Sequence, residues 1–213
     1  MKKLLLSVVC ILIGITTFAQ TQLYENPNFA ELTKDHKVIG LVPFKTTVKL
    51  RPKDMKEMSS EQIRDLQINE SENLHFAMYS WFMKRKEVGK LSVDVQDVTT
   101  TTALLRQNNI TPDNIEDYTP GELAKILGVD AIISGKFETN KPMSEGATVA
   151  LAVLVGVYGP TNKAVLNLFI HNAADGQLLV NYNKAVSGSL GSSTEDLVNI
   201  LLRKASRRVT YTK

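Results

Sequence analysis

Residues 119–137 have the sequence TPGELAKILGVDAIISGKF, and this stretch decides the fold. Thr119 is suited to cap a helix, Pro120 fits the first helical turn, and Glu122 completes the spacing of a capping box. Gly128 then suits the left-handed conformation that ends many helices. The apolar run that follows the glycine predicts a strand directly after the helix. This succession of helix, glycine and strand is the best-defined local unit of the chain.

Apolar periodicity and turn signals predict further elements on both sides of this unit. They are a buried strand at 38–44, a long helix at 60–86, an alternating strand at 91–98, a short helix at 100–107, a hairpin of strands at 163–171 and 177–187, and a last helix at 194–209. The charged segment 45–60 contains Pro52 and is expected to be a loop. The order of elements predicts an α/β (α+β) fold, a single two-layer domain in which helices pack on one mixed sheet.

Residues 1–20 have the layout of a secretory signal peptide. Lys2 and Lys3 precede an apolar run at 4–15, and small and polar residues follow it. The run is shorter than the roughly 20 apolar residues of a membrane span. We therefore expect cleavage near Ala19–Gln20 and export to the periplasm or to the periplasmic face of the outer membrane, with an uncleaved anchor as the alternative.

The mature chain is expected to carry neither a cysteine nor a strong net charge. Cys10, the only cysteine, lies in the middle of the leader's apolar run. Removal of Lys2 and Lys3 from the 25 basic residues leaves 23 against 22 acidic ones, a net charge of +1. So small a charge does not favour nucleic acid as a partner.

We expect a polar leader at 21–36, a domain at 37–213, and an apolar insertion at about 144–162. Within the insertion, residues 147–158 (ATVALAVLVGVY) carry no charge. Three interpretations stay open, namely a core element or lid, a surface for self-association or a partner, and a membrane contact that the fold does not require. The candidate interaction residues are Val149, Leu151, Val153, Leu154, Val155, Val157 and Tyr158.

The sequence contains no recognisable catalytic, metal or cofactor motif. His36, His75 and His171 lack metal-ligand spacing and are expected to be surface or internally satisfied residues, unless a site forms in three dimensions only. There is no Gly-x-Ser-x-Gly elbow, and no cysteine remains as a nucleophile. We expect no catalytic residues, no metal and no cofactor.

A loop rich in glycine and serine precedes the last helix and is a candidate anion site. Backbone N–H groups before a helix can hold an anion, although this loop lacks the Lys-Ser/Thr ending of a P-loop. Its candidate residues are Gly188, Gly191, Ser192 and Ser193. Ser192 and Glu195 also have the spacing of a capping box for the last helix.

The run LAKILGVDAIISG at 123–135 resembles the helix-to-strand unit shared by the TolB N-terminal region, the curli secretion protein CsgG and the penicillin-binding-protein activator LpoB. VIGLVPF at 38–44 is similar to their first strand, and Asp175-Gly176 and the last helix also fit. The resemblance covers about 37–209 and implies a non-enzymatic envelope domain, similar in fold to anticodon-binding domains, that docks to proteins or forms rings. The Phe-Ala-Gln ending of the leader resembles signal peptides of Bacteroidetes.

Together these patterns favour a non-catalytic cell-envelope protein that docks to a protein partner or self-assembles. The alternative is a periplasmic module that binds a small ligand or an anion, using the loop at 188–193 and the basic end of the last helix. An envelope hydrolase with a site invisible in the sequence is the third possibility.

Overall fold

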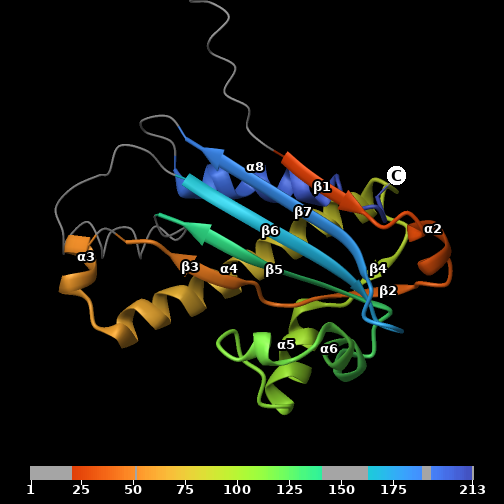
Figure 1. The fold of residues 1–213 in the computed structure, drawn as a ribbon, viewed down its shortest axis with the longest axis horizontal. Coiled ribbons are helices and arrows are strands. Elements are labelled where there is room, and N and C mark those ends of the chain that lie inside the picture. Colours follow the sequence, from red (N-terminus) through yellow and green to blue (C-terminus); the bar gives the residue numbers. More distant parts are fainter. Residues whose placement is uncertain (1–20, 51, 141–162, 189–192, 213) are drawn as a thin grey trace, which may run out of the picture.

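The computed structural model describes residues 21–50, 52–140, 163–188 and 193–212. They form a mixed α/β domain around a seven-stranded sheet with the order β1-β7-β6-β5-β2-β4, in which β3 also pairs with β5 (Figure 1). The predicted α/β class and mixed sheet are confirmed. Within these ranges, no helix combines the length and apolarity needed to cross a membrane.

The sheet is built around β5, which is paired along both of its edges. On one edge β6 runs antiparallel to it, followed by β7 and β1, each antiparallel to its neighbour. On the other edge β2 and then β3 run parallel to β5, and β4 is parallel to β2. The strands are β1 (Thr21–Glu25), β2 (Val38–Leu41), β3 (Lys45–Val48), β4 (Asp94–Val95), β5 (Ala131–Thr139), β6 (Lys163–Asn172) and β7 (Leu178–Ser187).

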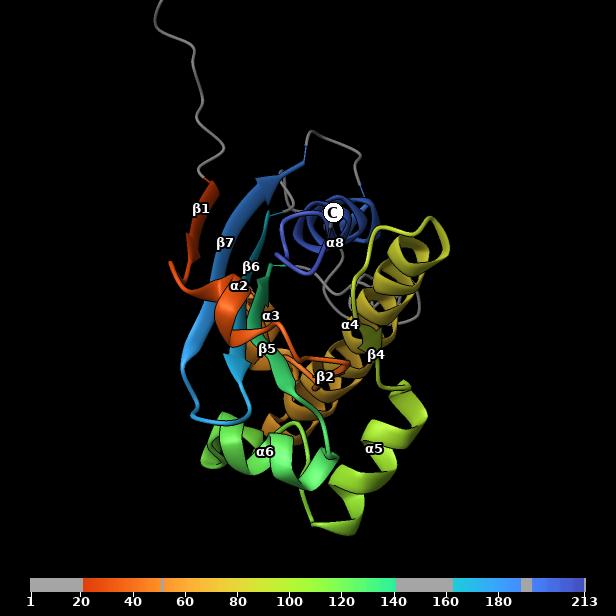
Figure 2. The same ribbon diagram turned by 90° about the vertical axis from the view of Figure 1, so that its right-hand side faces the viewer.

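Helices cover one face of the sheet and one end of the other. α4 (Ser60–Glu87) and α8 (Thr194–Ser206) lie over the first face, while α5 (Val98–Gln107) and α6 (Pro120–Leu127) lie together at the lower end of the domain in Figure 2, with α5 below α4. Short helical turns complete the chain: α2 (Phe29–Leu32), α3 (Pro52–Glu57) and the 3-10 turn η1 (Ile115–Asp117).

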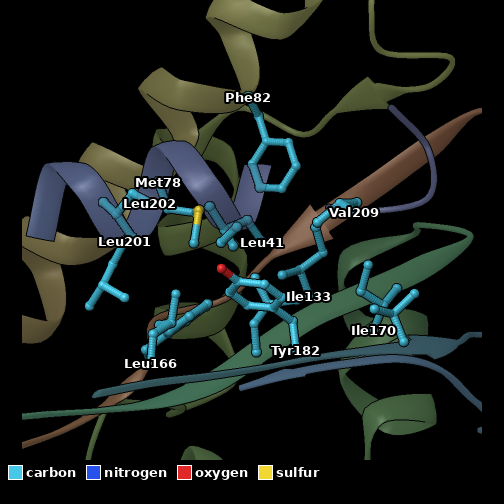
Figure 3. Packing of buried hydrophobic residues seen from close by; sticks show 14 of the residues in the cluster. Leu41, Met78, Phe82, Ile133, Leu166, Ile170, Tyr182, Leu201, Leu202 and Val209 are labelled. Atoms are coloured by element: carbon cyan, nitrogen blue, oxygen red, sulfur yellow. The ribbon is translucent and has the colours of Figure 1, made fainter. Parts of the chain in front are cut away.

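The main core lies between the sheet and the pair α4 and α8. Figure 3 shows Met78 and Phe82 of α4 beside Leu201 of α8, facing Leu166 and Tyr182 of the sheet. All five side chains are at most 1% exposed. Because apolar side chains in such a core exclude water from both surfaces, their burial is the main favourable contribution to this packing.

A second cluster occupies the other side of the sheet. Ile132 of β5 and Val42 contact Leu105 of α5 and Leu123 of α6. Since Ile132 and Ile133 are neighbours in one strand, their side chains point to opposite faces, and each enters a different cluster.

The unit at 119–137 has the predicted geometry. The Thr119 hydroxyl accepts a bond from the Glu122 backbone N–H at 3.3 Å, and the Glu122 carboxylate accepts one from the Thr119 N–H at 2.8 Å. Gly128 ends α6 in the left-handed region with φ 65°. Asp130 then accepts bonds from the backbone N–H groups of Lys37 and Val38, at 2.7 and 2.9 Å, which ties the unit to β2.

The structure corrects several of the predicted boundaries. The expected loop at 45–60 contains β3 and α3, because β5 extends beyond the end of β2 and offers a further edge that β3 pairs with. The strand expected at 91–98 is reduced to Asp94–Val95, although its side chains do alternate in burial. The cap of α8 is Ser193, whose hydroxyl accepts a bond from the Asp196 N–H at 3.0 Å, and not Ser192.

Gly135 in β5 has no room for a side chain. A Cβ there would lie 2.3 Å from the Asn167 carbonyl oxygen and 2.8 Å from the Phe44 ring. We predict that Gly135→Ala lowers the free energy of unfolding by about 2–3 kcal/mol, because overpacking forces backbone and ring apart. Urea unfolding would measure the change.

Gly121→Ala in α6 is the matched control. The nearest atom to its added Cβ would be the Ala173 carbonyl oxygen at 4.0 Å, and alanine favours a helix. This variant should be at least as stable as the parent chain. Equal stability of the parent and Gly135→Ala would contradict the close approach of Phe44 to β5.

Candidate functional site

A cleft of about 490 Å³ lies between α4 and α5. This volume falls within the range typical of ligand pockets. Its exposed wall is mainly apolar, with Ile68 and Phe76 of α4, Ala103 and Leu105 of α5, and Ile110 of the following loop. His75, three threonines and four charged side chains supply the polar groups of the lining. Ile68 and Phe76 share one face of α4 because they are eight residues apart, and His75 lies seven residues after Ile68 on the same side.

His75 is the one buried titratable side chain of this cleft. It is 2% exposed, and its Nε2 lies 2.7 Å from the Leu41 carbonyl oxygen. Because a carbonyl oxygen only accepts, Nε2 carries the proton and Nδ1 is left as an acceptor. The bond to Leu41 is the one hydrogen bond that the described part of the chain gives this ring, and Nδ1 is not among the fully buried polar atoms without a partner. The cleft therefore offers this nitrogen as an acceptor, beside the hydroxyl groups of Thr99, Thr102 and Thr111.

Burial keeps the His75 ring neutral. Desolvation lowers its pKa from 6.5 to about 4, against a smaller opposing effect of the bond to Leu41. A general base works best when its pKa lies near the working pH, so a ring of this pKa is suited to accept hydrogen bonds. At neutral pH the ring is therefore uncharged, and its Nδ1 can accept a hydrogen bond.

Ser71, one turn before His75, anchors the same part of α4. Its hydroxyl donates to the Phe44 carbonyl oxygen at 2.6 Å. Leu41 and Phe44 flank the break between β2 and β3, where the edge of the sheet is interrupted. His75 thus supplies a partner for the Leu41 carbonyl group, while the Phe44 carbonyl oxygen accepts from Ser71 and also from the Thr46 hydroxyl at 3.2 Å.

Two ion pairs lie at the rim of the cleft. The Arg64 Nε lies 2.9 Å from an Asp113 carboxylate oxygen, and an Arg106 Nη2 lies 3.9 Å from one of Glu72. All four side chains are more than 40% exposed, so each pair contributes at most about 1 kcal/mol. The rim thus has balanced charge and can rearrange at low cost.

Phe76 stands at the edge of the cleft and is 55% exposed. An exposed ring beside an apolar floor is typical of contact sites, because a partner that covers it removes apolar surface from water. Phe76 and His75 are adjacent, with ring centroids 6.3 Å apart.

The residues singled out from the sequence lie elsewhere. The interaction segment Val149–Tyr158 falls outside the described residues, as do Gly191 and Ser192 of the anion loop. Of the remaining two, Ser193 caps α8, and its hydroxyl donates to an Asp196 carboxylate oxygen at 2.8 Å. Both segments stay predictions.

The three histidines are not brought together. The His36 Nδ1 lies 2.6 Å from the Tyr211 hydroxyl, while His171 in β6 has a buried Nδ1 without a partner. Across the described ranges, no group of three or more His, Cys, Asp or Glu side chains could hold a metal. His75 was not predicted as a site residue, because its spacing to the other histidines is uninformative. The available signal was a polar pair, Ser71 and His75, within an apolar helix stripe.

No protein-family model and no curated protein matches this sequence. Among solved structures, the chain is similar to the PelC dodecamer from Paraburkholderia phytofirmans (8% identity, 89% of this chain, 95% of that chain, TM-score 0.42). It is also similar to lipoprotein GNA1162 from Neisseria meningitidis (14% identity, 81% of this chain, 97% of that chain, TM-score 0.43). A third similar structure is the LpoB C-terminal domain from Salmonella enterica (11% identity, 75% of this chain, 93% of that chain, TM-score 0.32). LpoB is also one of the proteins that 123–135 resembles. With TM-scores below 0.5, these similarities assign no function to this chain.

The buried ring of His75 predicts a loss of stability in acid. Between pH 6.5 and 4 the unfolded chain binds a proton at His75 and the folded chain does not, so falling pH favours unfolding. We predict a loss of up to about 3 kcal/mol over this window from His75 alone. Urea unfolding at pH 7 and pH 4.5 would measure it.

The control is a pair of variants. His75→Gln, whose side chain stays uncharged, should lose most of this pH dependence whatever its stability at pH 7. His171→Gln should retain most of the pH dependence. Burial also lowers the pKa of His171, so this residue too loses stability in acid, but it is less buried than His75 and its contribution is smaller. Identical pH dependence in the parent chain and in His75→Gln would rule out His75 as the source.

Proposed function

We propose that this protein is a non-catalytic binding module of the cell envelope that holds a protein partner through the α4–α5 cleft. The observation that carries the proposal is the buried, neutral His75, which lines an apolar cleft and has an acceptor nitrogen to spare. A ligand that supplies a donor to this nitrogen would form a hydrogen bond at the wall of the cleft, and such a bond contributes about 0.5–1.5 kcal/mol.

The occupant that fits this chemistry is an aromatic side chain with a polar tip, tryptophan or tyrosine, inserted from a segment of the partner. Its ring would lie against Ile68 and Phe76, and its N–H or O–H would donate to Nδ1 of His75. Tryptophan and tyrosine are enriched at interfaces because they combine apolar area with one hydrogen-bonding group. The partner's main chain would cross the rim beside Arg64 and Arg106.

The proposed location rests on the leader. Residues 1–20 support export, and the balanced charge of the remaining chain does not favour nucleic acid. Docking to an envelope protein is thus the primary proposal. A small-molecule ligand is the second candidate, favoured by the cleft volume of about 490 Å³.

Export predicts a defined mature N-terminus. The protein recovered from the periplasm or membrane fraction of exporting cells should begin at Gln20 or Thr21, by intact mass and N-terminal sequencing. Such cleavage would leave β1 complete, because β1 begins at Thr21. A chain that retains Met1 would support the uncleaved anchor instead.

A peptide titration tests the cleft. We predict that N-acetyl-Gly-Trp-Gly-amide shifts the side-chain ¹⁵N resonances of His75 in the labelled protein. The same peptide with 1-methyltryptophan, which lacks the indole donor, should bind about tenfold more weakly, since one hydrogen bond is lost. Chemical-shift changes against concentration give both dissociation constants.

Two surface variants provide the matched controls. Phe76→Ala should weaken binding of the tryptophan peptide about tenfold, because it removes the exposed ring at the cleft edge. Val88→Ala, which truncates a 59% exposed side chain just beyond α4, should leave binding unchanged. Binding of free indole at His75 without binding of the peptide would favour the small-ligand candidate. Failure of both probes to shift His75 would overturn the cleft as a binding site.

A further inference from the structure

The outer edge of β1 is unpaired among the residues that the structure describes. β1 pairs with β7 along one side, and on its other side no described strand follows (Figure 1). All five of its side chains are exposed, including Leu23 at 42% and Tyr24 at 46%. Its sequence, TQLYE, contains neither the lysine nor the proline with which proteins commonly block an edge.

The register identifies the main-chain groups that face outward. The Asn26 N–H donates to the Leu179 carbonyl oxygen at 2.8 Å, so Asn26 faces β7. Because the direction alternates along a strand, Gln22 and Tyr24 also face β7. The N–H and C=O groups of Thr21, Leu23 and Glu25 therefore point away from the sheet.

We infer that this edge pairs with a second copy of the chain, β1 antiparallel to β1, about a two-fold axis at Leu23. In this register Leu23 faces Leu23 of the second copy, and Thr21 faces Glu25 of the second copy. Every outward N–H and C=O group of both strands then has a partner. The same patch meets itself, as a two-fold interface requires.

Charge favours a two-fold axis at Leu23 over one at Glu25. Thr21 is paired with Lys184 of β7, and the Lys184 Nζ donates to the Thr21 hydroxyl. On the other side of Thr21 lies the position that Glu25 of the second copy would take. Cross-strand neighbours share one face of a sheet, so the carboxylate approaches the Lys184 ammonium group. Lys204 of α8 adds positive charge nearby, because it contributes with burial to the lowered pKa of Lys184. An axis at Glu25 would instead oppose two carboxylates.

Pairing of β1 with a second copy does not involve the α4–α5 cleft. β1 and β4 are the two ends of the sheet order, and α5, which follows β4, carries one wall of the cleft. Pairing through β1 therefore leaves the α4–α5 cleft accessible. Loss of dimerisation and loss of peptide binding are separate results.

Cysteine crosslinking tests the register directly. The exported chain has no other cysteine once residues 1–20 are removed. In Leu23→Cys the two introduced thiols would lie across the axis with Cα atoms about 5.5 Å apart, within the span of a disulfide. Mild oxidation at micromolar protein should convert most of this variant into a covalent dimer.

Two neighbouring positions are the matched controls. In Gln22→Cys or in Tyr24→Cys alone, like positions would be about 8 Å apart, beyond the reach of a disulfide. A mixture of these two variants should nevertheless crosslink, because Gln22 faces Tyr24 of the second copy. Equal crosslinking of all three single variants, or none in Leu23→Cys, would overturn the inference.

Leu23→Pro provides a second, independent measurement. Proline removes the outward N–H of Leu23 and leaves the bonds between β1 and β7 in place. Sedimentation should show dimerisation weakened about tenfold, since two symmetric hydrogen bonds are lost. An unchanged urea midpoint would show that the fold is kept. Dimerisation as strong as in the parent chain, or a parent chain that stays monomeric at high micromolar concentration, would contradict the proposed pairing.

Discussion

The break between β2 and β3 is the constraint on which the arrangement of this domain depends. β5 is nine residues long, and its parallel edge is covered first by β2 and then by β3. Between them the chain turns through Pro43, which has no N–H to donate. The carbonyl groups of Leu41 and Phe44 are satisfied by His75 and Ser71 of α4. A long helix is thereby held against the interrupted edge by two buried hydrogen bonds.

The His75 contact also borders the cleft. α5 contacts α4 and also adds Leu105 to the second core cluster, and the cleft lies between the two helices. His75 uses one ring nitrogen to position α4, and in the proposed function the other would accept a hydrogen bond from a ligand. One residue thus links the stability of the fold to the chemistry of the cleft, and its neutral ring suits both roles.

Local signals explain which parts of the structure were predictable. The capping box at Thr119 and Glu122, the left-handed Gly128 and the hairpin at Asp175-Gly176 are encoded within a few residues, and each was predicted correctly. β1 and β3 were missed because their short, polar sequences become strands only when β7 and β5 offer an edge. The cleft was missed because it joins α4 to α5 through tertiary packing. No spacing in the sequence encodes that contact.

The two proposed surfaces reinforce one another physically. Pairing through β1 would place two α4–α5 clefts on one rigid body, with the joined sheets between them. A partner that carries two suitable aromatic segments would bind the second one as an intramolecular event, at an effective concentration set by its linker. A cleft that binds a single side chain weakly would then still hold such a partner, provided that the linker spans the dimer.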